Sequence, residues 1–419
     1  MTAGDEPVLD ERFLRGLDER LMAVDERVRR HYPGDPAARQ PVHTVYVPAS
    51  RFQPDLVGTW AAQARSVLDR HGGGPEGMTE TLGIRITAEV YERVVAKLER
   101  EPVEDLRIDF EDGYGDRGDA AEDADAVAAA RRLVESLAAE MAPPFVGIRC
   151  KGLERATRRR GIRTLDLFLS ALLAQVPVPT GFVVTLPKVV AVEHVEAFVE
   201  VLEQLEQAYG LPAGRLRLEV QIETPQSVLS PDGTVATARI VAAAGDRCAG
   251  LHYGTYDYSA ALGVSAGQQS LAHPAADFAK SLMQVAAAGT GVRVSDGSTN
   301  LLPEGDGSAV RAGWREHARL VRRSLERAFY QGWDLHPHQL PSRFLATYAF
   351  FRDGLPDSAQ RLRAYASRAG NGILDEPATA QALATFLLRG VDCGAFDPAE
   401  VTTATALDGG ALDRYARRG

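Results

Sequence analysis

The stretch LRLEVQIETP, residues 216–225, decides how this chain is interpreted, because a β-rich run over 216–222 ends there at the carboxylate of Glu223. The stretch AGLHYGTYD, residues 249–257, repeats the arrangement, with an apolar run followed by Asp257. Core packing does not explain a carboxylate at the end of an apolar strand, because burying an unpaired charge costs on the order of several kcal/mol. Two carboxylates on successive strands predict two hard oxygen ligands on one rim, which suits Mg²⁺. The alternative, that both residues cap the helices that follow, stays open.

Short β-rich runs alternate with longer amphipathic segments along the chain. There are eight of them, at residues 43–49, 106–110, 145–150, 181–186, 216–222, 249–253, 291–294 and 333–336. From the second run onward they recur at intervals of about 33 to 43 residues, which is one strand–helix unit with modest loops. No Gly-x-Gly-x-x-Gly follows the first run. The pattern therefore predicts an α/β fold of the (β/α)₈ TIM barrel type rather than an open doubly wound sheet.

The remaining segments divide the chain into three expected parts. Residues 1–42 form an N-terminal helical arm, with a charged helix over 10–32 that lies across the barrel or a neighbouring subunit. Residues 43–342 form the catalytic barrel. Residues 343–419 are helical and too few for an independent core, so we expect a C-terminal lid or oligomerisation segment.

Helices and turns outside the regular units are also predicted. Residues 50–104 are too many for one strand–helix unit, so we expect two helices, 56–71 and 87–100, with the Gly-rich residues 72–77 between them. In the C-terminal segment, the sequence Gly-Leu-Pro-Asp at 354–357 predicts a turn between helices.

Composition excludes several classes of protein. The chain is 45% hydrophobic and 25% charged, and no apolar run approaches the length of a membrane span. Its N-terminus lacks the basic and apolar segments of a signal peptide. Cys150, Cys248 and Cys393 are widely spaced, so we expect no disulfide framework and a cytoplasmic location. A net charge of −10 argues against nucleic acid as the main partner.

Eight short motifs follow the order of the strands. They are VPASR (47–51), IDFED (108–112), GIR (147–149), LPKV (186–189), IET (222–224), GTYD (254–257), HPHQ (336–339) and GILDEP (372–377). Together they resemble the citrate lyase β-subunit and malyl-CoA lyase branch of the HpcH/HpaI aldolase superfamily. The resemblance covers roughly residues 43–390, and the chain is identified as a divergent member.

The resemblance implies a Mg²⁺-dependent enzyme, with Mn²⁺ as an alternative ion, that makes or breaks a carbon–carbon bond through an enolate. Glu223 and Asp257 correspond to the metal-binding carboxylates of the family. Arg149 would present positive charge to the developing oxyanion. Asp375 matches the acid/base carboxylate that family members place over the active site of the adjacent subunit.

Other roles stay open for these residues. Arg149 is alternatively a structural arginine that pairs with Asp109 or Asp112, and Asp375 is alternatively a helix N-cap. Lys188 is alternatively the Schiff-base lysine of a class I aldolase.

The supporting residues at the strand ends receive expected roles as well. Glu111 and Asp112 are expected to orient Arg149 and metal-bound water as part of the catalytic group. Arg51 and Lys188 are the expected contacts of the coenzyme A substrate.

The expected substrate is a malyl-CoA- or citramalyl-CoA-like 2-hydroxy acid thioester, so the partners are a small 2-oxo acid or an acyl-CoA. One alternative is a CoA-independent class II 2-oxo acid aldolase. Another is an inactive barrel that binds a small acid as a regulator or scaffold. Tyr256 departs from the family, which usually has Glu at this position. The family also implies a homotrimer or homohexamer.

Overall fold

Eight parallel strands form the centre of the computed structural model, which describes residues 8–36, 38–367 and 375–416. The strands are β1 (His43–Pro48), β2 (Asp105–Asp109), β3 (Phe145–Arg149), β4 (Val183–Leu186), β5 (Arg217–Ile222), β6 (Cys248–Tyr253), β7 (Arg293–Ser295) and β8 (Gly332–Asp334). They pair in the order β7-β6-β5-β4-β3-β2-β1-β8. Backbone hydrogen bonds from Asp296 to Gln331 (2.8 Å) and from Trp333 to Gly297 (3.3 Å) join the two ends of this sheet. The predicted (β/α)₈ barrel is confirmed.

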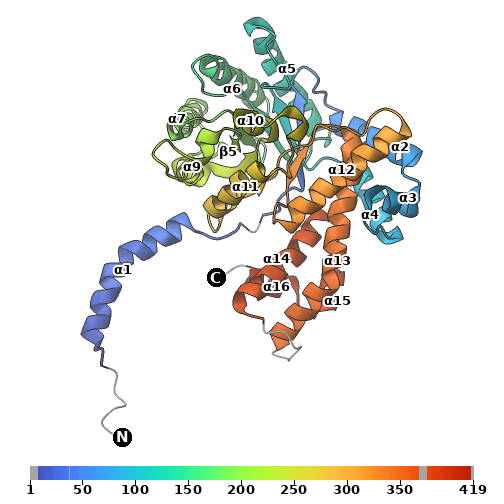
Figure 1. Ribbon diagram of the computed structural model, residues 1–419. Coiled ribbons are helices and arrows are strands. Elements are labelled where there is room, and N and C mark those ends of the chain that lie inside the picture. The colour runs from blue at the N-terminus through green and yellow to red at the C-terminus, as the bar shows by residue number, and fades with distance from the viewer. Residues whose placement is uncertain (1–7, 37, 368–374, 417–419) are drawn as a thin grey trace.

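Helices surround the strands on the outside of the barrel (Figure 1). The longer ones up to β8 are α2 (Leu56–His71), α3 (Gly74–Leu82), α4 (Ala88–Arg100), α5 (Asp119–Ala138), α6 (Arg158–Leu173), α7 (Val192–Tyr209), α9 (Ala236–Ala244), α11 (Pro274–Ala287) and α12 (Gly307–Glu326). Short helices α8 (Pro225–Val228) and α10 (Thr255–Ala261) follow β5 and β6 directly. They place the start of a helix beside the carboxyl end of each of these two strands.

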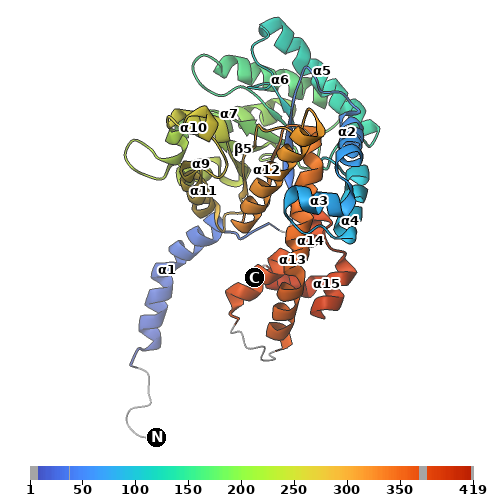
Figure 2. The ribbon, with the colours of Figure 1, turned by 45° about the vertical axis from the view of Figure 1, so that its right-hand side comes forward.

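Two segments lie outside the barrel. Helix α1 (Glu11–His31) projects away from it, as Figures 1 and 2 show. After β8, α13 (Leu340–Ser367) leads to α14 (Pro377–Cys393), α15 (Pro398–Thr405) and α16 (Gly409–Ala416); α14 and α15 pack along α13, and α16 packs against α14. None of the described helices combines the length and the apolar character needed to cross a membrane.

Helix α3 was not predicted from the sequence, and it begins within the Gly-rich residues 72–77. Gly73 and Gly74 have φ of +67° and +70°, a conformation that glycine adopts without strain. A Cβ on Gly77 would lie 2.3 Å from the carbonyl oxygen of Gly72, so the helix starts in a very close backbone contact. Pro75 occupies the first turn, where its missing N–H costs nothing.

The turn predicted at residues 354–357 was wrong, because α13 continues through Pro356. The preceding Gly354 lies against the ring of Phe386 on α14, and a Cβ there would be 2.5 Å from the ring. This tight helix–helix packing outweighs the hydrogen bond that proline removes from the helix.

Below the rim, the barrel interior contains a layer of paired charges. Arg107 donates two hydrogen bonds of 2.8 Å to Glu219, and His252 Nε2 lies 2.9 Å from the same carboxylate. Trp333 Nε1 donates to His252 Nδ1 at 2.9 Å. Side chains alternate along a strand, so Glu219 and Gln221 of β5 and Glu223, which follows it, all point to the barrel interior, each one layer above the last. The charged layer therefore supports the residues of the rim directly above it.

Candidate metal and active site

Glu223 lies where β5 and β6 end side by side. Ile222 and Tyr253 are paired in the ladder, and the N–H of Gly254 donates to the carbonyl of Ile222 at 3.0 Å. A Cβ on Gly254 would lie only 2.3 Å from Cβ of Glu223, so any larger residue would displace this carboxylate. Thr224, rather than Glu223, caps α8 by accepting from the N–H of Ser227. Capping therefore does not explain Glu223.

Glu223 and Asp257 both contact Lys188, which follows β4. The N–H of Lys188 donates to Oε1 of Glu223 at 2.7 Å, and its Nζ lies 2.7 Å from Oδ2 of Asp257. Lys188 has φ of +54°, which is uncommon for a residue other than glycine. The strained turn aims both the backbone and the side chain of one residue at the two predicted metal ligands.

The ammonium of Lys188 also contacts the loop after β2. Its Nζ lies 3.0 Å from Oδ2 of Asp112 and 3.7 Å from Oε1 of Glu111. Burial alone would lower the pKa of Lys188, but the charges of Glu223 and Glu111, with hydrogen bonds to Asp257 and Asp112, raise it above its ordinary value. A Schiff-base lysine must be neutral to attack a carbonyl. The raised pKa keeps Lys188 protonated, which argues against the Schiff-base alternative.

Arg149, the last residue of β3, is buried and held by carboxylates. Its Nε and Nη2 donate to the two oxygens of Asp109 at 2.6 and 2.8 Å, and Nη1 lies 3.2 Å from Oε2 of Glu111. Asp109 also accepts the N–H groups of Glu111 and Gly113, which fixes the loop after β2. The pairing with Asp109 that the sequence left open is thus present. It also fixes the direction of the guanidinium.

Two carboxyl groups in this cluster have raised pKa values. Burial raises the pKa of Glu111 to about 8, against the opposing charges of Arg149 and Lys188. Burial likewise raises the pKa of Glu223 to about 6, again opposed by Lys188 and Arg149. For Asp112, burial alone would raise the pKa, but hydrogen bonds with Glu111 and Lys188 lower it. At neutral pH, Glu111 therefore keeps its proton beside an ionised Asp112.

Two buried donors next to Arg149 have no hydrogen-bond partner among the residues that the structure describes. They are Nε2 of Gln221 and the hydroxyl of Tyr46, whose ring lies 4.7 Å from the guanidinium carbon of Arg149. Oε1 of Gln221 accepts from Arg149 Nη1 at 3.4 Å. We did not identify either residue from the sequence. The signal for Gln221 was its position two residues before Glu223, which puts both on one face of β5.

The structure therefore brings together Arg149, Glu111, Asp112, Lys188, Glu223 and Asp257, and leaves the other two predicted residues apart. Arg51 is exposed, and its N–H donates to the carbonyl of Pro48 at 2.8 Å. Asp375 accepts from Arg361 of α13 at 2.7 Å. Residues 372–374 of the GILDEP motif lie outside the described residues.

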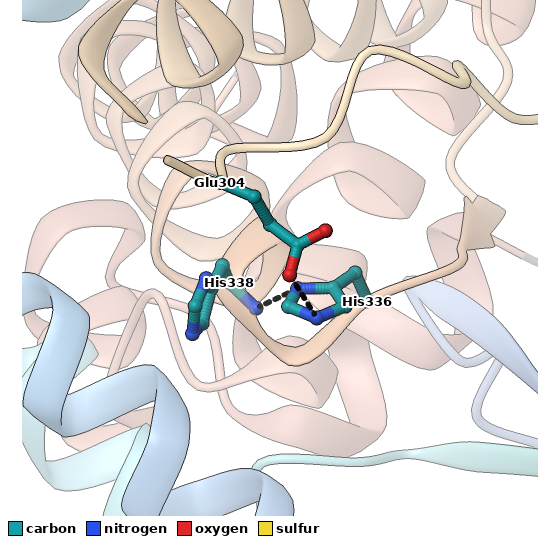
Figure 3. A group of neighbouring side chains, drawn as sticks. All are labelled: Glu304, His336 and His338. Atoms are coloured by element: carbon teal, nitrogen blue, oxygen red, sulfur yellow. Dashed lines mark hydrogen bonds and ion pairs between the residues drawn. The ribbon is translucent and has the colours of Figure 1, made fainter. Parts of the chain in front are cut away.

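A different group of possible ligands lies beyond β8 (Figure 3). Within the described parts of the chain, Glu304, His336 and His338 are the one set of three such side chains whose ligand atoms lie within 4.8 Å of one another. Three of their four ring nitrogens are already engaged: His336 Nδ1 accepts from the N–H of His338, its Nε2 lies 3.2 Å from Glu304, and His338 Nδ1 bonds to the carbonyl of Pro303. His336 and Gln339 also form a capping box on a 3₁₀ turn. These contacts account for the group as local structure.

Residues 21–419 match the family described as a domain of unknown function, DUF6986. The chain belongs to this family. No curated protein is significantly similar to it in sequence.

Among solved structures, the malate synthase of Haloferax volcanii with glyoxylate is similar at a TM-score of 0.51 and 14% identity, over 92% of this chain and 99% of that one. The CitE protein of Mycobacterium tuberculosis, in complex with magnesium, acetoacetate and coenzyme A, gives a TM-score of 0.49 and 18% identity, over 85% and 99%. At these identities the likeness to malate synthase concerns the fold.

Proposed function

We propose that this chain is a metal-dependent enzyme that makes or breaks a carbon–carbon bond through an enolate, with Mg²⁺ held by Glu223 and Asp257. The observation that carries this proposal is the convergence of four carboxyl groups, those of Glu111, Asp112, Glu223 and Asp257, on Lys188. Because Glu111 keeps its proton at neutral pH, the single ammonium group of Lys188 faces three carboxylates, those of Asp112, Glu223 and Asp257, and does not balance them. The excess of negative charge at a partly buried rim suits a divalent cation.

The donor set fits Mg²⁺ rather than a softer metal. Glu223 and Asp257 offer hard carboxylate oxygens, and Mg²⁺ typically takes one or two of these and completes its shell with water and substrate. When bound, the ion would supply Lewis acidity at the oxo or hydroxy oxygen of a small acid. Mn²⁺ has similar ligand preferences and is the practical probe for binding.

The remaining groups match the needs of enolate chemistry. Arg149 offers fixed positive charge to an oxyanion, because its Nε and Nη2 are already anchored by Asp109. The unpartnered donors of Gln221 and Tyr46 offer further hydrogen bonds to a small acid. Glu111 holds a proton at neutral pH and is one candidate for proton transfer, with Asp112 as its hydrogen-bonded partner.

The proposed substrate is a malyl-CoA- or citramalyl-CoA-like thioester, or its parts: a small 2-oxo acid and an acyl-CoA. Glyoxylate is the 2-oxo acid to test first, because the malate synthase that shares this fold was studied with it. Arg51, exposed after β1, is the proposed contact for an anionic part of coenzyme A.

The experiment that tests the function is product analysis by mass spectrometry. Enzyme with Mg²⁺ and glyoxylate is incubated with acetyl-CoA or propionyl-CoA, and separately with pyruvate in place of the thioester. The Glu223→Gln variant, which keeps the shape of the side chain and loses its charge, is the matched control. Malyl-CoA or methylmalyl-CoA, formed by the wild-type chain and not by the variant, supports the proposal.

The other outcomes are informative too. A product from the mixture without CoA alone would move the assignment to a class II 2-oxo acid aldolase. Full activity in EDTA would remove the metal from the proposal. No product together with no binding of Mn²⁺ would favour an inactive barrel that binds a small acid.

A further inference from the structure

Helix α1 carries an apolar stripe that none of the described parts of its own chain covers. The stripe consists of five residues spaced alternately three and four apart, Leu14, Leu17, Leu21, Val24 and Val28. No residue of α1 is buried, and the exposed fractions of Leu21 and Val28 are 43% and 50%. A spacing of three and four residues is the a/d pattern of a coiled coil, in which a second helix covers the stripe.

Acidic side chains lie along one edge of the stripe and basic side chains along the other. Asp18 and Asp25 flank it on one side, at the e positions of the heptad, and Arg20 and Arg27 flank it on the other, at the g positions. Within the described residues, none of these four side chains has an ion-pair partner. By contrast, charges on the outer face pair along the helix, as Glu26 does with Arg29 and Arg30. All four charges that would border a second helix are therefore available for pairing with it.

We propose that α1 pairs with α1 of a second copy of this chain as a parallel, in-register coiled coil. In that arrangement each g position faces the next e position of the other helix, so Arg20 of one copy meets Asp25 of the other, twice by symmetry. An antiparallel pair would instead bring arginine toward arginine and aspartate toward aspartate. The positions of the positive and negative side chains on α1 thus favour a second copy of α1 as the partner, in parallel orientation.

The composition of α1 argues against a membrane surface as the occupant of the stripe. The helix contains six arginines and five acidic residues, so it lacks the strongly cationic polar face of membrane-binding helices. In a single copy of the chain, α1 is already capped at its N-terminus, and the segment after it is attached to the barrel. Asp10 caps α1 by accepting from the N–H of Phe13 at 2.7 Å, and the N–H of Gly34 donates to the carbonyl of Gly289 at 2.9 Å.

The stripe spans about two heptads, fewer than the three or four typical of a self-sufficient coiled coil. Pairing of α1 is therefore expected to be weak and to depend on protein concentration or on a further contact between the subunits. A measurement that captures short-lived pairs is needed.

Disulfide cross-linking of the full chain provides that measurement. In the Leu14→Cys variant, a parallel pair puts the two new thiols side by side, whereas in an antiparallel pair they are about 21 Å apart along the axis. Cys150, Cys248 and Cys393 are buried, so they give little background. Arg12→Cys, on the outer face, is the matched control. We expect cross-linking of Leu14→Cys on the order of tenfold faster than of Arg12→Cys, and equal rates would overturn the proposal.

A charge exchange distinguishes self-pairing from docking on another surface. Arg20→Glu alone and Asp25→Arg alone, each added to Leu14→Cys, should slow cross-linking because each creates repulsion between the two copies. The double variant Arg20→Glu/Asp25→Arg should recover the original rate, and a mixture of the two single variants should cross-link with each other preferentially. If the double variant stays as slow as the single ones, α1 binds a different surface and the proposal fails. Since α1 adds nothing to the core, these variants should fold as the wild-type chain does.

Discussion

The contacts of Arg149 are compatible with two roles: a structural pairing with Asp109 and the stabilisation of an oxyanion. Asp109 holds its Nε and Nη2, so Nη1 is the part left facing Glu111 and Gln221. A lysine at this position would keep the charge but not the planar fork that Asp109 orients. The distinction between the two roles therefore depends on geometry rather than on charge.

We expect Arg149→Lys to reduce kcat by about 10²–10³-fold, the typical cost of one lost oxyanion donor, while Mn²⁺ binding is kept. Steady-state kinetics and Mn²⁺ titration measure the two effects. Arg247→Lys is the matched control, because Arg247 makes two 2.7 Å contacts with Glu206 elsewhere in the barrel. Turnover close to that of the wild type in Arg149→Lys would assign this arginine to structure alone.

Glu111 gives the metal-free protein a pH-dependent stability. Its pKa is raised from the ordinary 4.5 to about 8, so the folded state binds a proton that the unfolded state releases. This stabilisation is complete below the unfolded pKa and is lost as the pH rises through 8. In EDTA, the free energy of unfolding should therefore fall between pH 5 and pH 8 by on the order of 1–3 kcal/mol.

Glu111→Gln should flatten this dependence, because the amide stays neutral at every pH. Denaturant unfolding at pH 5, 6.5 and 8 measures it. Glu135→Gln, an exposed position on α5, is the control and should behave as the wild type does. A slope that Glu111→Gln leaves unchanged would mean that another group is responsible.

Several site residues could be predicted from the sequence because each lies at the end of a strand or within four residues after it. Arg149, Glu223 and Asp257 were identified in this way, and the structure brings them to one rim. The contacts of Lys188 could not be predicted, because they depend on a positive φ that is rare outside glycine. The sequence also gave no measure of how deeply Glu111 is buried, and burial is the main cause of its raised pKa.

At the scale of elements, the corner from β6 to α10 determines where Glu223 can lie. Gly254 has an ordinary negative φ of −98°, so its lack of a side chain matters for space rather than for backbone freedom. A methyl group there would overlap with both Cβ and Oε2 of Glu223. The motif that begins with Gly254 and ends with Asp257 thus serves both predicted metal ligands.

Gly254→Ala should therefore weaken Mn²⁺ binding by tenfold or more and destabilise the fold by about 1–3 kcal/mol, as overpacking does. Calorimetric titration and denaturant unfolding measure these effects. Gly58→Ala is the control: it lies on the exposed face of α2 with open space around it, and should stabilise by up to about 1 kcal/mol. Unchanged Mn²⁺ affinity in Gly254→Ala would contradict the proposed position of the metal.

The strands could be predicted more closely than the helices. The eight runs found in the sequence match β1 to β8 to within about two residues at most ends, because buried parallel strands have a strong apolar signature. The errors at α3 and Pro356 share one cause. In both places, close packing of glycine against backbone or an aromatic ring holds a helix that local propensity would break.

At the scale of the whole molecule, Asp375 lies far from the rim of its own barrel. Helix α13 starts after β8, at the carboxyl end of the barrel, and its 28 residues span about 42 Å before the segment that contains Asp375. Arg389 of α14 contacts Gln40, which precedes β1 and so lies at the opposite end of the barrel from the rim. If Asp375 acts in catalysis, it must therefore act on the site of another subunit.

That geometry leads to a prediction about mixed oligomers. We propose that the chain is a homo-oligomer, a trimer or a hexamer, in which the segment around Asp375 reaches a neighbouring rim; the hexamer is the form in which every α1 can also pair with one other copy. Glu223→Gln and Asp375→Ala subunits should each be inactive alone. Mixed under conditions of subunit exchange, they should regain part of the activity, because some sites then combine an intact Glu223 with an intact Asp375 of another subunit. The carbon–carbon lyase assay measures this recovery.

Two controls make the result decisive. Mixing Glu223→Gln with Asp257→Asn subunits should restore nothing, because both residues contact Lys188 within one chain and each site would lack one of them in every combination. Exchange itself is followed by fluorescence transfer between labelled subunits. Activity of Asp375→Ala alone at the wild-type rate would return Asp375 to a structural role, in which it pairs with Arg361. Proven exchange without recovery would show that each barrel completes its site from its own chain, with Glu111 as the remaining candidate for proton transfer.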